Sequence, residues 1–537
     1  MTGSIRWPLF LTACLLGAGA FAAWFPRFDA AAIEWRTRSG RPQIIAAAAR
    51  VASLYGIDTT GWSFRVTAQY LRDRRLVRLE RPSSEVLAAF PPLQFAVHAS
   101  KPDSEFRIQV TLAEDLRPFG FRTYGPRWQL SSQPPLDMPK KMGERKARGM
   151  GFRPVDPQAA EAEAAAQLHL YAGSAAAHYV KTASAIPTPE GMRSAWEWAD
   201  PAEPGIVARL EMFTRRGFVH RVEHSLRVSE SLIQRRRSEA ELPRDLVALA
   251  AAFFATLTLF PAFWFFFKSL AQTFVPLRFA TALLPLFALP MALDMLFGPA
   301  ADSAIISAAA ANTSASAAWT NNGLALLMLS GAFLVLIAAG RYLLAPEQQR
   351  AWSALQCIYL RLHAARPAGA ALLAGLAAGP ALAALPLLAV LLSGQSGAAV
   401  QSIPSPVFLS AAHPWIAALG EANPALPLAV FGFVLPWSAR VLRATPAVVF
   451  TVAFYGFIAI FLFDSPLSGR SPLAIAACVL KLAGLWLVYS ASGLLGVWAS
   501  AISSAAAATS YAYALNGLSA EALSAAAPLA ALAAAGA

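Results

Sequence analysis

The stretch PQIIAAAARVASLYG (residues 42–56) has a near copy, PQAAEAEAAAQLHLYAG, at residues 157–173. Both stretches begin with Pro-Gln, continue in alanine and reach Leu-Tyr shortly before a glycine. Proline suits the first position of a helix, alanine is the strongest helix former, and glycine commonly follows the last turn. Each copy is therefore predicted to be a helix that ends near Gly56 or Gly173.

Each predicted helix is followed by a pair of alternating polar and apolar runs. The first pair, EFRIQVTL and FGFRTYG, lies within residues 105–125, and the second, IVARLEMF and GFVHRVEHSLRV, within residues 206–228. Alternation with a period of two on both sides of a short turn predicts a β-hairpin. A helix followed by antiparallel strands, present twice, predicts a duplicated α+β domain, because one copy is too small to bury a stable core.

The composition of the chain is that of a membrane protein. Hydrophobic residues make up 56% and charged residues 14%, and the mean hydropathy is +0.47. All but six of the 31 acidic and all but ten of the 44 basic residues precede residue 251, so only the first half is polar. The net charge of +13 does not indicate nucleic acid as a partner, because no nucleic-acid-binding motif accompanies it. Contact with anionic lipid headgroups explains the excess.

Apolar runs long enough to cross a bilayer begin at residues 7–25. This first run is predicted to be an anchor, with a cleaved signal peptide as the alternative. The last run is long enough to break near Ser490. The later runs cover approximately residues 246–267, 279–298, 323–344, 370–392, 425–439, 447–463 and 473–502.

Lysine and arginine lie in alternate connecting segments of the apolar half, and Arg470 is the one exception. This alternation predicts that the amino terminus and the basic segments face the cytoplasm, and that the α+β domain lies outside it. The basic segments are 268–278, 345–368 and 440–446, and the segments without Lys or Arg are 299–322 and 393–424.

The predicted fold is multi-domain: a duplicated extracytoplasmic α+β domain followed by an all-α, multi-pass transmembrane bundle of about seven spans. The alanine-rich tail is expected to be a frayed or surface-lying helix. The predicted boundaries are an anchor at 1–27, a first repeat at 28–133, a basic linker at 134–156, a second repeat at 157–243, the bundle at 244–516 and the tail at 517–537.

Three stretches carry a resemblance to a known family: YLRDRRLVRLER (70–81), FRIQVTLAEDLRPFGFRTYG (106–125) and ARLEMFTRRGFVHRVEHSLRV (208–228). They resemble an extracytoplasmic region found in front of bacterial CPBP proteins, the CAAX-protease-like or Abi intramembrane endopeptidases. The resemblance covers residues 28–232 and the general layout of the spans. It implies a protein of the bacterial inner membrane.

The catalytic motif of that family is absent from this sequence. The family has a Glu-Glu-x-x-x-Arg motif on one membrane helix and histidines on two others, which together activate water. After residue 250 this chain has no adjacent acids, and its only histidines are His363 and His413. No catalytic residue can be carried over, and the isolated Glu421 lies at the mouth of a span. The resemblance therefore implies a bundle without peptidase activity.

A second protease pattern is GQSG at 394–397, which matches the Gly-x-Ser-Gly of rhomboid serine proteases, with His413 as the base. Ser–His catalysis needs the two groups on separate rigid elements within hydrogen-bond reach. Here both lie in one loop rich in Ser, Pro and Ala. A solvated turn and a surface histidine are therefore predicted.

Three ionisable residues lie within or beside predicted spans: Asp294, Asp464 and Lys481. Such residues are costly in a membrane and are functional candidates by default. The sequence leaves three roles open: a structural ion pair, a ligand or ion site, and snorkelling of Lys481 to the interface. An atypical peptidase or transporter site around these three residues is the alternative function.

In the predicted external domain, strand spacing argues against a metal site made of histidines. His220 and His224, on one strand, would be about 13 Å apart, too far for one metal ion. They are predicted to be solvated, as are His169 and His178. Trp196 and Trp198 share a strand face, which favours core packing over a ligand-stacking platform. The triple Arg235–Arg237 before the next span is predicted to anchor at the lipid headgroups.

The sequence contains no Walker A, Rossmann, kinase, HExxH or CxxC pattern, so no cofactor and no metal are predicted. The function expected is that of an external domain that binds or senses an envelope peptide or a protein partner. The bundle, in contact with the lipid bilayer, is expected to be a non-catalytic scaffold.

Overall fold

The computed structural model divides into two compact units. The α+β unit is Glu34–Glu239, and the helical unit consists of Met1–Ile33 and Ala240–Ala537. The predicted linker at 134–156 and Arg235–Arg237 lie outside the residues that the structure describes. Those residues are 7–32, 39–70, 93–101, 106–124, 157–188, 191–199, 206–215, 218–228, 253, 259–273, 275–310, 315–344, 346–360, 366–393, 411–422, 425–442, 446–451 and 472–537.

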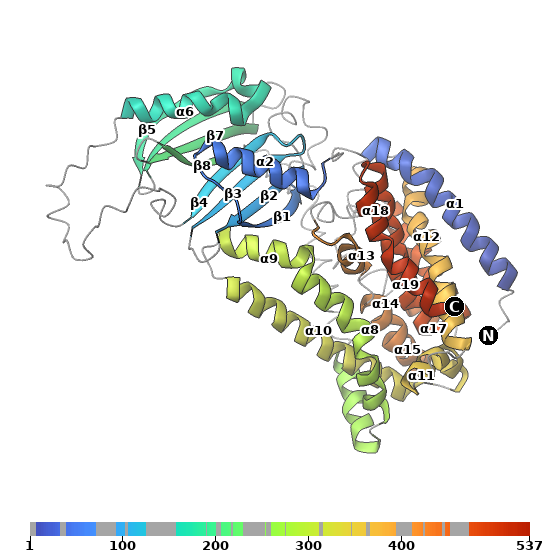
Figure 1. The fold of residues 1–537 in the computed structure, drawn as a ribbon. Helices are drawn as coiled ribbons and strands as arrows, with labels where there is room; N and C mark the ends of the chain where they lie inside the picture. The colour runs from blue at the N-terminus through green and yellow to red at the C-terminus, as the bar shows by residue number, and fades with distance from the viewer. Residues whose placement is uncertain are drawn as a thin grey trace. The chain divides into compact units, whose positions relative to one another are not determined.

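In the α+β unit, the order of one helix followed by four strands occurs twice (Figure 1). The first set is α2 (Arg41–Leu54), β1 (Ser63–Tyr70), β2 (Leu93–Ser100), β3 (Arg107–Ala113) and β4 (Pro118–Tyr124). The second set is α6 (Pro157–Ala172) with the 3₁₀ helix η2 (Gly173–His178), then β5 (Val180–Thr188), β6 (Gly191–Ala199), β7 (Ile206–Arg215) and β8 (Phe218–Val228).

All eight strands form one antiparallel sheet in the order β1-β2-β3-β4-β8-β7-β6-β5. The two meanders meet at its centre, where β4 pairs with β8 and Phe121 lies opposite Val222. In the last hairpin of each meander the register shifts, between Thr111 and Leu112 in one and between Phe213 and Thr214 in the other. Both hairpins that the sequence predicts, β3–β4 and β7–β8, are confirmed.

The glycines that end the two helices also behave alike. Gly56 has φ +69° and Gly173 has φ +58°. These angles lie in the left-handed region that only glycine enters at little cost. Both predicted helix ends are therefore confirmed.

One face of the sheet is apolar and buried. Its side chains include Val66, Phe95, Val110 and Leu210, each no more than 1% exposed. Two contacts place both helices on this face: Tyr55, just after α2, stacks on Phe121 with ring centroids 4.1 Å apart, and Thr214 in β7 donates to the Ala160 carbonyl of α6. Figure 1 shows α2 and α6 on the same side of the strands.

The described part of the helical unit is almost entirely helical. In chain order its helices are α1 (Trp7–Ala32), a helix at residues 259–272, α8 (Val275–Phe297), α9 (Pro299–Ala310), α10 (Ala315–Leu343), the 3₁₀ helix η3 (Pro346–Trp352), α11 (Ser353–Tyr359), α12 (Arg366–Ser393), α13 (Pro414–Ala422), α14 (Ala425–Ala429), the π-helical turn η6 (Val430–Val434), α15 (Leu435–Val441), a helix at residues 446–451, α17 (Pro472–Leu515), α18 (Ser519–Ala525) and α19 (Ala527–Gly536).

Six segments of the described residues are long and apolar enough to cross a membrane, so the chain is a multi-pass membrane protein. The predicted runs at 279–298, 323–344, 370–392 and 473–502 coincide with α8, α10, α12 and α17. The six segments are Pro276–Phe297, Trp319–Leu343, Arg366–Leu385, Pro414–Val441, Leu480–Leu515 and Ser519–Gly536.

Three expectations for the helical unit need correction. The segment 393–424, expected to be a loop, contains the helix α13 near its end. The segment 299–322, expected to be a loop, is mostly helical, because α9 and the first turns of α10 occupy it. The tail is not a frayed helix: α18 packs on α17, and α19 packs on α12 and α17. The α12–α19 contact is close because Gly369 lies directly against the Gly536 carbonyl. Small residues allow such close approach between helices in lipid.

The first helix belongs to the helical unit. Gly17 of α1 lies directly against Ala381 of α12, and the Tyr511 hydroxyl of α17 donates to the Ala22 carbonyl at 3.0 Å. Phe21 also packs on the Tyr511 ring, with centroids 5.6 Å apart. Helix α1 therefore packs against both α12 and α17, and its role as an anchor stays a prediction.

Glycines and serines allow α12 and α17 to pack closely. Gly375 and Gly379, one turn apart on α12, lie against Ala499 and Ser503 of α17. The Ser503 hydroxyl donates to the Leu376 carbonyl at 2.8 Å. Small residues spaced by four positions, together with hydrogen bonds across the interface, stabilise helix pairs in membranes.

Candidate functional site

A row of side chains crosses all eight strands on the face opposite α2 and α6. Residues paired across neighbouring antiparallel strands lie on the same face, and alternate residues of one strand share a face. We call this side of the sheet the arginine face. Followed from β1 to β5, the row is Arg65, His98, Gln109, Arg122, Arg221, Phe213, Arg193 and Ile186.

The arginine face has a net positive charge. Among the strand residues whose side chains the structure describes, seven arginines and three glutamates lie on it. The arginines are Arg65, Arg107, Arg122, Arg193, Arg209, Arg221 and Arg227, and the glutamates are Glu197, Glu211 and Glu223. The opposite face, by contrast, is the apolar core.

Each glutamate of this face pairs with arginine. Glu223 contacts Arg221 at 2.6 Å and Arg122 at 3.9 Å. Glu211 contacts Arg209 at 2.6 Å and Arg193 at 3.7 Å. The third, Glu197, contacts Arg209 at 3.3 Å. The acids hold the guanidinium groups of these arginines in place.

His98 lies within the row and is almost completely buried. Burial, together with the nearby Arg107 and Arg65, lowers the pKa of His98 to about 4. Both causes disfavour the charged imidazolium. His98 is therefore a neutral member of the row at pH 7, and the charge of the face comes from its arginines.

The two tyrosines of the repeated phrase meet on the apolar side of the sheet. The Tyr55 and Tyr171 hydroxyl oxygens lie 2.7 Å apart, and Tyr55 donates to Gln167 Oε1 at 2.5 Å. Gln167 Nε2 in turn donates to Glu163 at 2.8 Å. Because Tyr55 uses its proton on Gln167, Tyr171 must donate to Tyr55. Burial raises the pKa of Tyr171 well above its ordinary value, so it remains a protonated donor.

The predictions for the remaining histidines and tryptophans have mixed outcomes. His169 and His178 are exposed, as expected. His224 is not solvated: it packs on the Phe119 ring with centroids 4.1 Å apart, and burial and the nearby Arg117 lower its pKa to about 3. Alternation along β8 directs it to the helix-covered face, which its strand spacing alone could not show.

His220 is half-buried beside the Phe213 ring. Trp196 and Trp198 are buried at 4% and 6% exposure, which confirms core packing. No group of three or more His, Cys, Asp or Glu within the described ranges could hold a metal ion.

The intramembrane candidates do not all lie within the described residues. Asp464 is outside them. Asp294 is half-buried near the end of α8, where its carboxylate accepts from the Ala300 N–H of α9 at 3.4 Å. It also lies against Gly420 of α13, where a Cβ would be 2.6 Å from the Asp294 carboxyl carbon. Lys481 is an exposed residue of α17.

Of the protease-like residues, Ser396 and His363 lie outside the described residues. His413 is exposed, and its backbone carbonyl accepts from the Ile416 N–H as α13 begins. Glu421, at the other end of α13, is also exposed.

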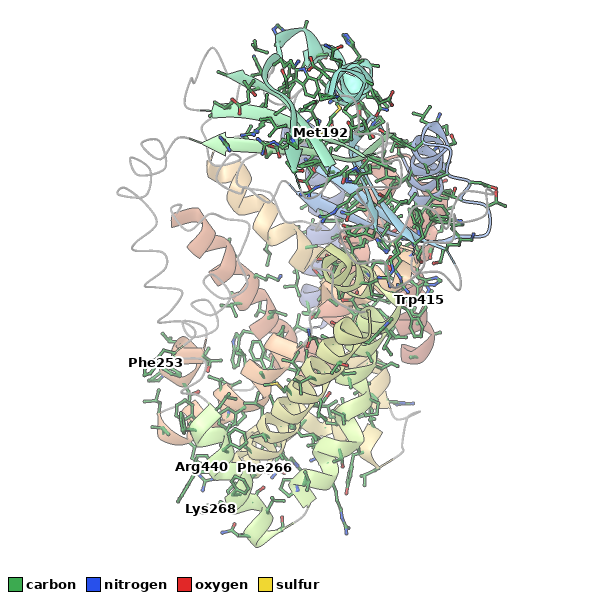
Figure 2. All side chains as sticks on the ribbon, turned by 90° about the vertical axis from the view of Figure 1, so that its left-hand side faces the viewer. Met192, Phe253, Phe266, Lys268, Trp415 and Arg440 are labelled. Atoms are coloured by element: carbon green, nitrogen blue, oxygen red, sulfur yellow. The ribbon has the colours of Figure 1, made fainter. Side chains whose placement is uncertain are left out.

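Basic residues collect at one end of the helical unit. Figure 2 shows Lys268 and Arg440 at the same end, with Trp415 of α13 farther along the unit. The Tyr342 hydroxyl donates to Gln272 Oε1 at 2.6 Å, which brings the end of α10, next to Arg341, to the same place. Lys268, Arg440 and the end of α10 therefore lie at one end of the helical unit, and the side of the membrane that this end faces stays a prediction.

Comparisons with known proteins supply no relative. No family model, curated protein or solved structure matches this chain.

Sequence reasoning missed the arginine face as a unit. The arginines lie on six strands that are distant in the chain, and only the pairing of β4 with β8 makes their rows continuous. The sequence feature that points to this face is the alternation of arginine with apolar residues, as in RVEHSLRV (221–228). It identifies a polar face within one strand but does not say which strands are neighbours.

Proposed function

We propose that this chain is a multi-pass membrane protein whose α+β unit binds an anionic partner through the arginine face. The helical unit is its scaffold in the bilayer. The observation that carries the proposal is the asymmetry of the sheet: α2 and α6 cover one face, and on the other the described strand side chains include seven arginines and three glutamates. An excess of fixed positive charge on one face attracts anionic partners and orients them.

The partner surface is already ordered. Arg122 lies over the Tyr124 ring at 4.9 Å, and Arg221 lies over the Phe213 ring at 4.8 Å. Together with the glutamate pairs, these contacts restrict the arginine side chains before a partner arrives. Less conformational entropy is then lost on binding.

Internal duplication is the origin that we infer for this surface. Four features support it: the repeated helix sequence, the matched left-handed glycines, the matched register shifts and the contact between Tyr55 and Tyr171. Joining two four-stranded meanders at β4 and β8 doubles the width of the face. A single copy would present half as many arginine-bearing strands.

The location that we propose is the bacterial inner membrane, with the amino terminus in the cytoplasm and the α+β unit outside it. The alternation of basic connecting segments and the shared end of Lys268 and Arg440 support this orientation. The CPBP-like character of the bundle is proposed on the sequence resemblance alone. The lack of a Glu-Glu-x-x-x-Arg motif supports a non-catalytic role.

Binding of labelled polyphosphate to the full-length chain in nanodiscs of neutral lipid tests the proposal. We expect fluorescence anisotropy to show binding that weakens as salt is added, because exposed charges are screened. Changing Arg122→Gln and Arg193→Gln together should weaken binding about tenfold, since each exposed ion pair contributes up to about 1 kcal/mol. Both glutamate partners retain a second arginine in this variant, Arg221 for Glu223 and Arg209 for Glu211.

The matched control is Arg50→Gln, because Arg50 is an exposed arginine on α2, away from the arginine face. It should bind polyphosphate like the unchanged chain. The proposal would be refuted if binding did not depend on salt concentration, or if Arg50→Gln weakened it as much as the double variant does.

A further inference from the structure

If the arginine face binds an anionic partner, as proposed above, its surroundings indicate the chemical class of that partner. Two observations beyond the net charge bear on it: the apolar groups beside the arginines, and the breadth of the arginine face.

Exposed apolar side chains border the arginines at one edge of the sheet. In β5, Val180 is 68% and Ile186 is 45% exposed. Val180 is paired with Glu197 and Ile186 with Arg193, so both belong to the arginine face. A cationic surface with apolar groups at its margin matches a bilayer interface, where arginines meet headgroup phosphates and apolar side chains reach the acyl boundary.

The width of the face also fits a lipid surface. Adjacent strands are about 4.8 Å apart, so the eight-stranded row extends over about 34 Å. The outer members of the row are Arg65 on β1 and Ile186 on β5. His98 and Phe213 within the row are buried, but its four arginines are partly exposed and lie on both sides of the β4–β8 junction. Positive charge spread in this way suits several headgroups at once better than one small anion.

We infer that the arginine face docks on the anionic headgroups of the bilayer in which the helical unit is embedded. Arg122 and Arg193, with side chains 29% and 31% exposed, would contact phosphates, and Val180 and Ile186 would enter the interface. The partner is phospholipid, and docking depends on the charge of its headgroup.

The test places a fluorophore on the arginine face of the full-length chain, in a background without Cys14, Cys357 and Cys478. Ser225 is exposed and paired with Arg209, so Ser225→Cys carries the label on this face. Ala46 is exposed on α2, which covers the other face, so Ala46→Cys is the matched control label. Nanodiscs contain a headgroup-nitroxide lipid, which quenches only nearby fluorophores.

In discs that contain phosphatidylglycerol, we expect the Ser225 label to be quenched severalfold more than in discs of phosphatidylcholine alone. High salt, or Arg122→Gln with Arg193→Gln, should remove most of the difference, and the Ala46 label should show none. Equal quenching of the Ser225 label in both kinds of disc, measured with all arginines of the face intact, would overturn the inference.

Polyphosphate added to the same neutral discs separates this inference from the proposed function. A salt-sensitive change at Ser225 with polyphosphate, together with no response to phosphatidylglycerol, leaves anion binding in place and refutes lipid as the partner. No response to either anion refutes both.

Discussion

The hydroxyl oxygens of Tyr55 and Tyr171 lie 2.7 Å apart, although the two residues are separated by 116 positions in the chain. They are the tyrosines of the phrase that occurs twice in the sequence. Tyr55 is followed directly by Gly56, and Tyr171 lies two residues before Gly173. The two helix ends therefore meet above the junction of β4 and β8, where Tyr55 stacks on Phe121.

The direction of this hydrogen bond predicts unequal effects of two similar substitutions. Tyr171→Phe removes a donor but leaves Tyr55 bonded to Gln167, so the loss should be about 1 kcal/mol of unfolding free energy. Tyr55→Phe leaves the fully buried Tyr171 hydroxyl without its acceptor, which should cost about 2–3 kcal/mol. Thermal unfolding of both variants and of the double variant measures the difference. Equal losses would show that the donor assignment is wrong.

The low pKa of His98 predicts a loss of stability in acid. The unfolded chain takes up a proton near pH 6.5, but folded His98 does so only near pH 4, so the unfolded state binds more protons between these values. Stability should be complete above pH 6.5 and fall as the pH drops to about 4. His98→Gln should flatten the pH dependence of the α+β unfolding transition between pH 4 and 6.5. An unchanged slope would contradict the assigned burial.

The break in α17 predicts a position where only glycine is tolerated. Gly493 has φ +72° and lies directly against the Ala351 carbonyl of η3, so a Cβ there would be both strained and overlapping. Gly493→Ala should lower the melting temperature of the helical unit by several degrees. Gly323→Ala is the control, because a Cβ at Gly323 of α10 would meet no atom within 4 Å. If Gly323→Ala lowered the melting temperature more than Gly493→Ala does, Gly493 would not be the position that requires glycine.

The basic end of the helical unit predicts which residues an impermeant thiol reagent can reach from outside the cell. In a cysteine-free background, Thr273→Cys lies in the basic segment after Lys268, and Asn321→Cys lies at the opposite end of α10 from Arg341. Both positions are exposed. The reagent should label Asn321→Cys in intact cells and reach Thr273→Cys only after permeabilisation. The reverse order would invert the proposed topology.

The parts of the fold that the sequence predicts are those set by local patterns. Alternation fixes the β3–β4 and β7–β8 hairpins, hydropathy fixes α8, α10, α12 and α17, and the suggested break near Ser490 occurs at Gly493. These features need only neighbours in the chain. Local pattern does not identify strand partners, which is why the β4–β8 junction and the continuous arginine face were not predicted.

The candidate site illustrates the same limit. In the sequence, Asp294 is notable as a charged residue within a span. In the structure its carboxylate accepts a hydrogen bond from the Ala300 N–H and lies against Gly420. These partners belong to the short helices α9 and α13, which hydropathy alone does not identify. His224 appeared solvated from its strand spacing, yet the pleat directs it onto Phe119. Arginine and glutamate partners across strands become visible only once the register is known.

The most direct test of anion binding by the arginine face is a footprint of arginine reactivity. The full-length chain in neutral nanodiscs is treated with phenylglyoxal, with and without polyphosphate, and modified peptides are quantified by mass spectrometry. The account predicts that polyphosphate protects Arg122 and Arg193 severalfold and leaves the exposed Arg50 of α2 unchanged. Equal protection at all three arginines, or protection at Arg50 alone, would contradict it.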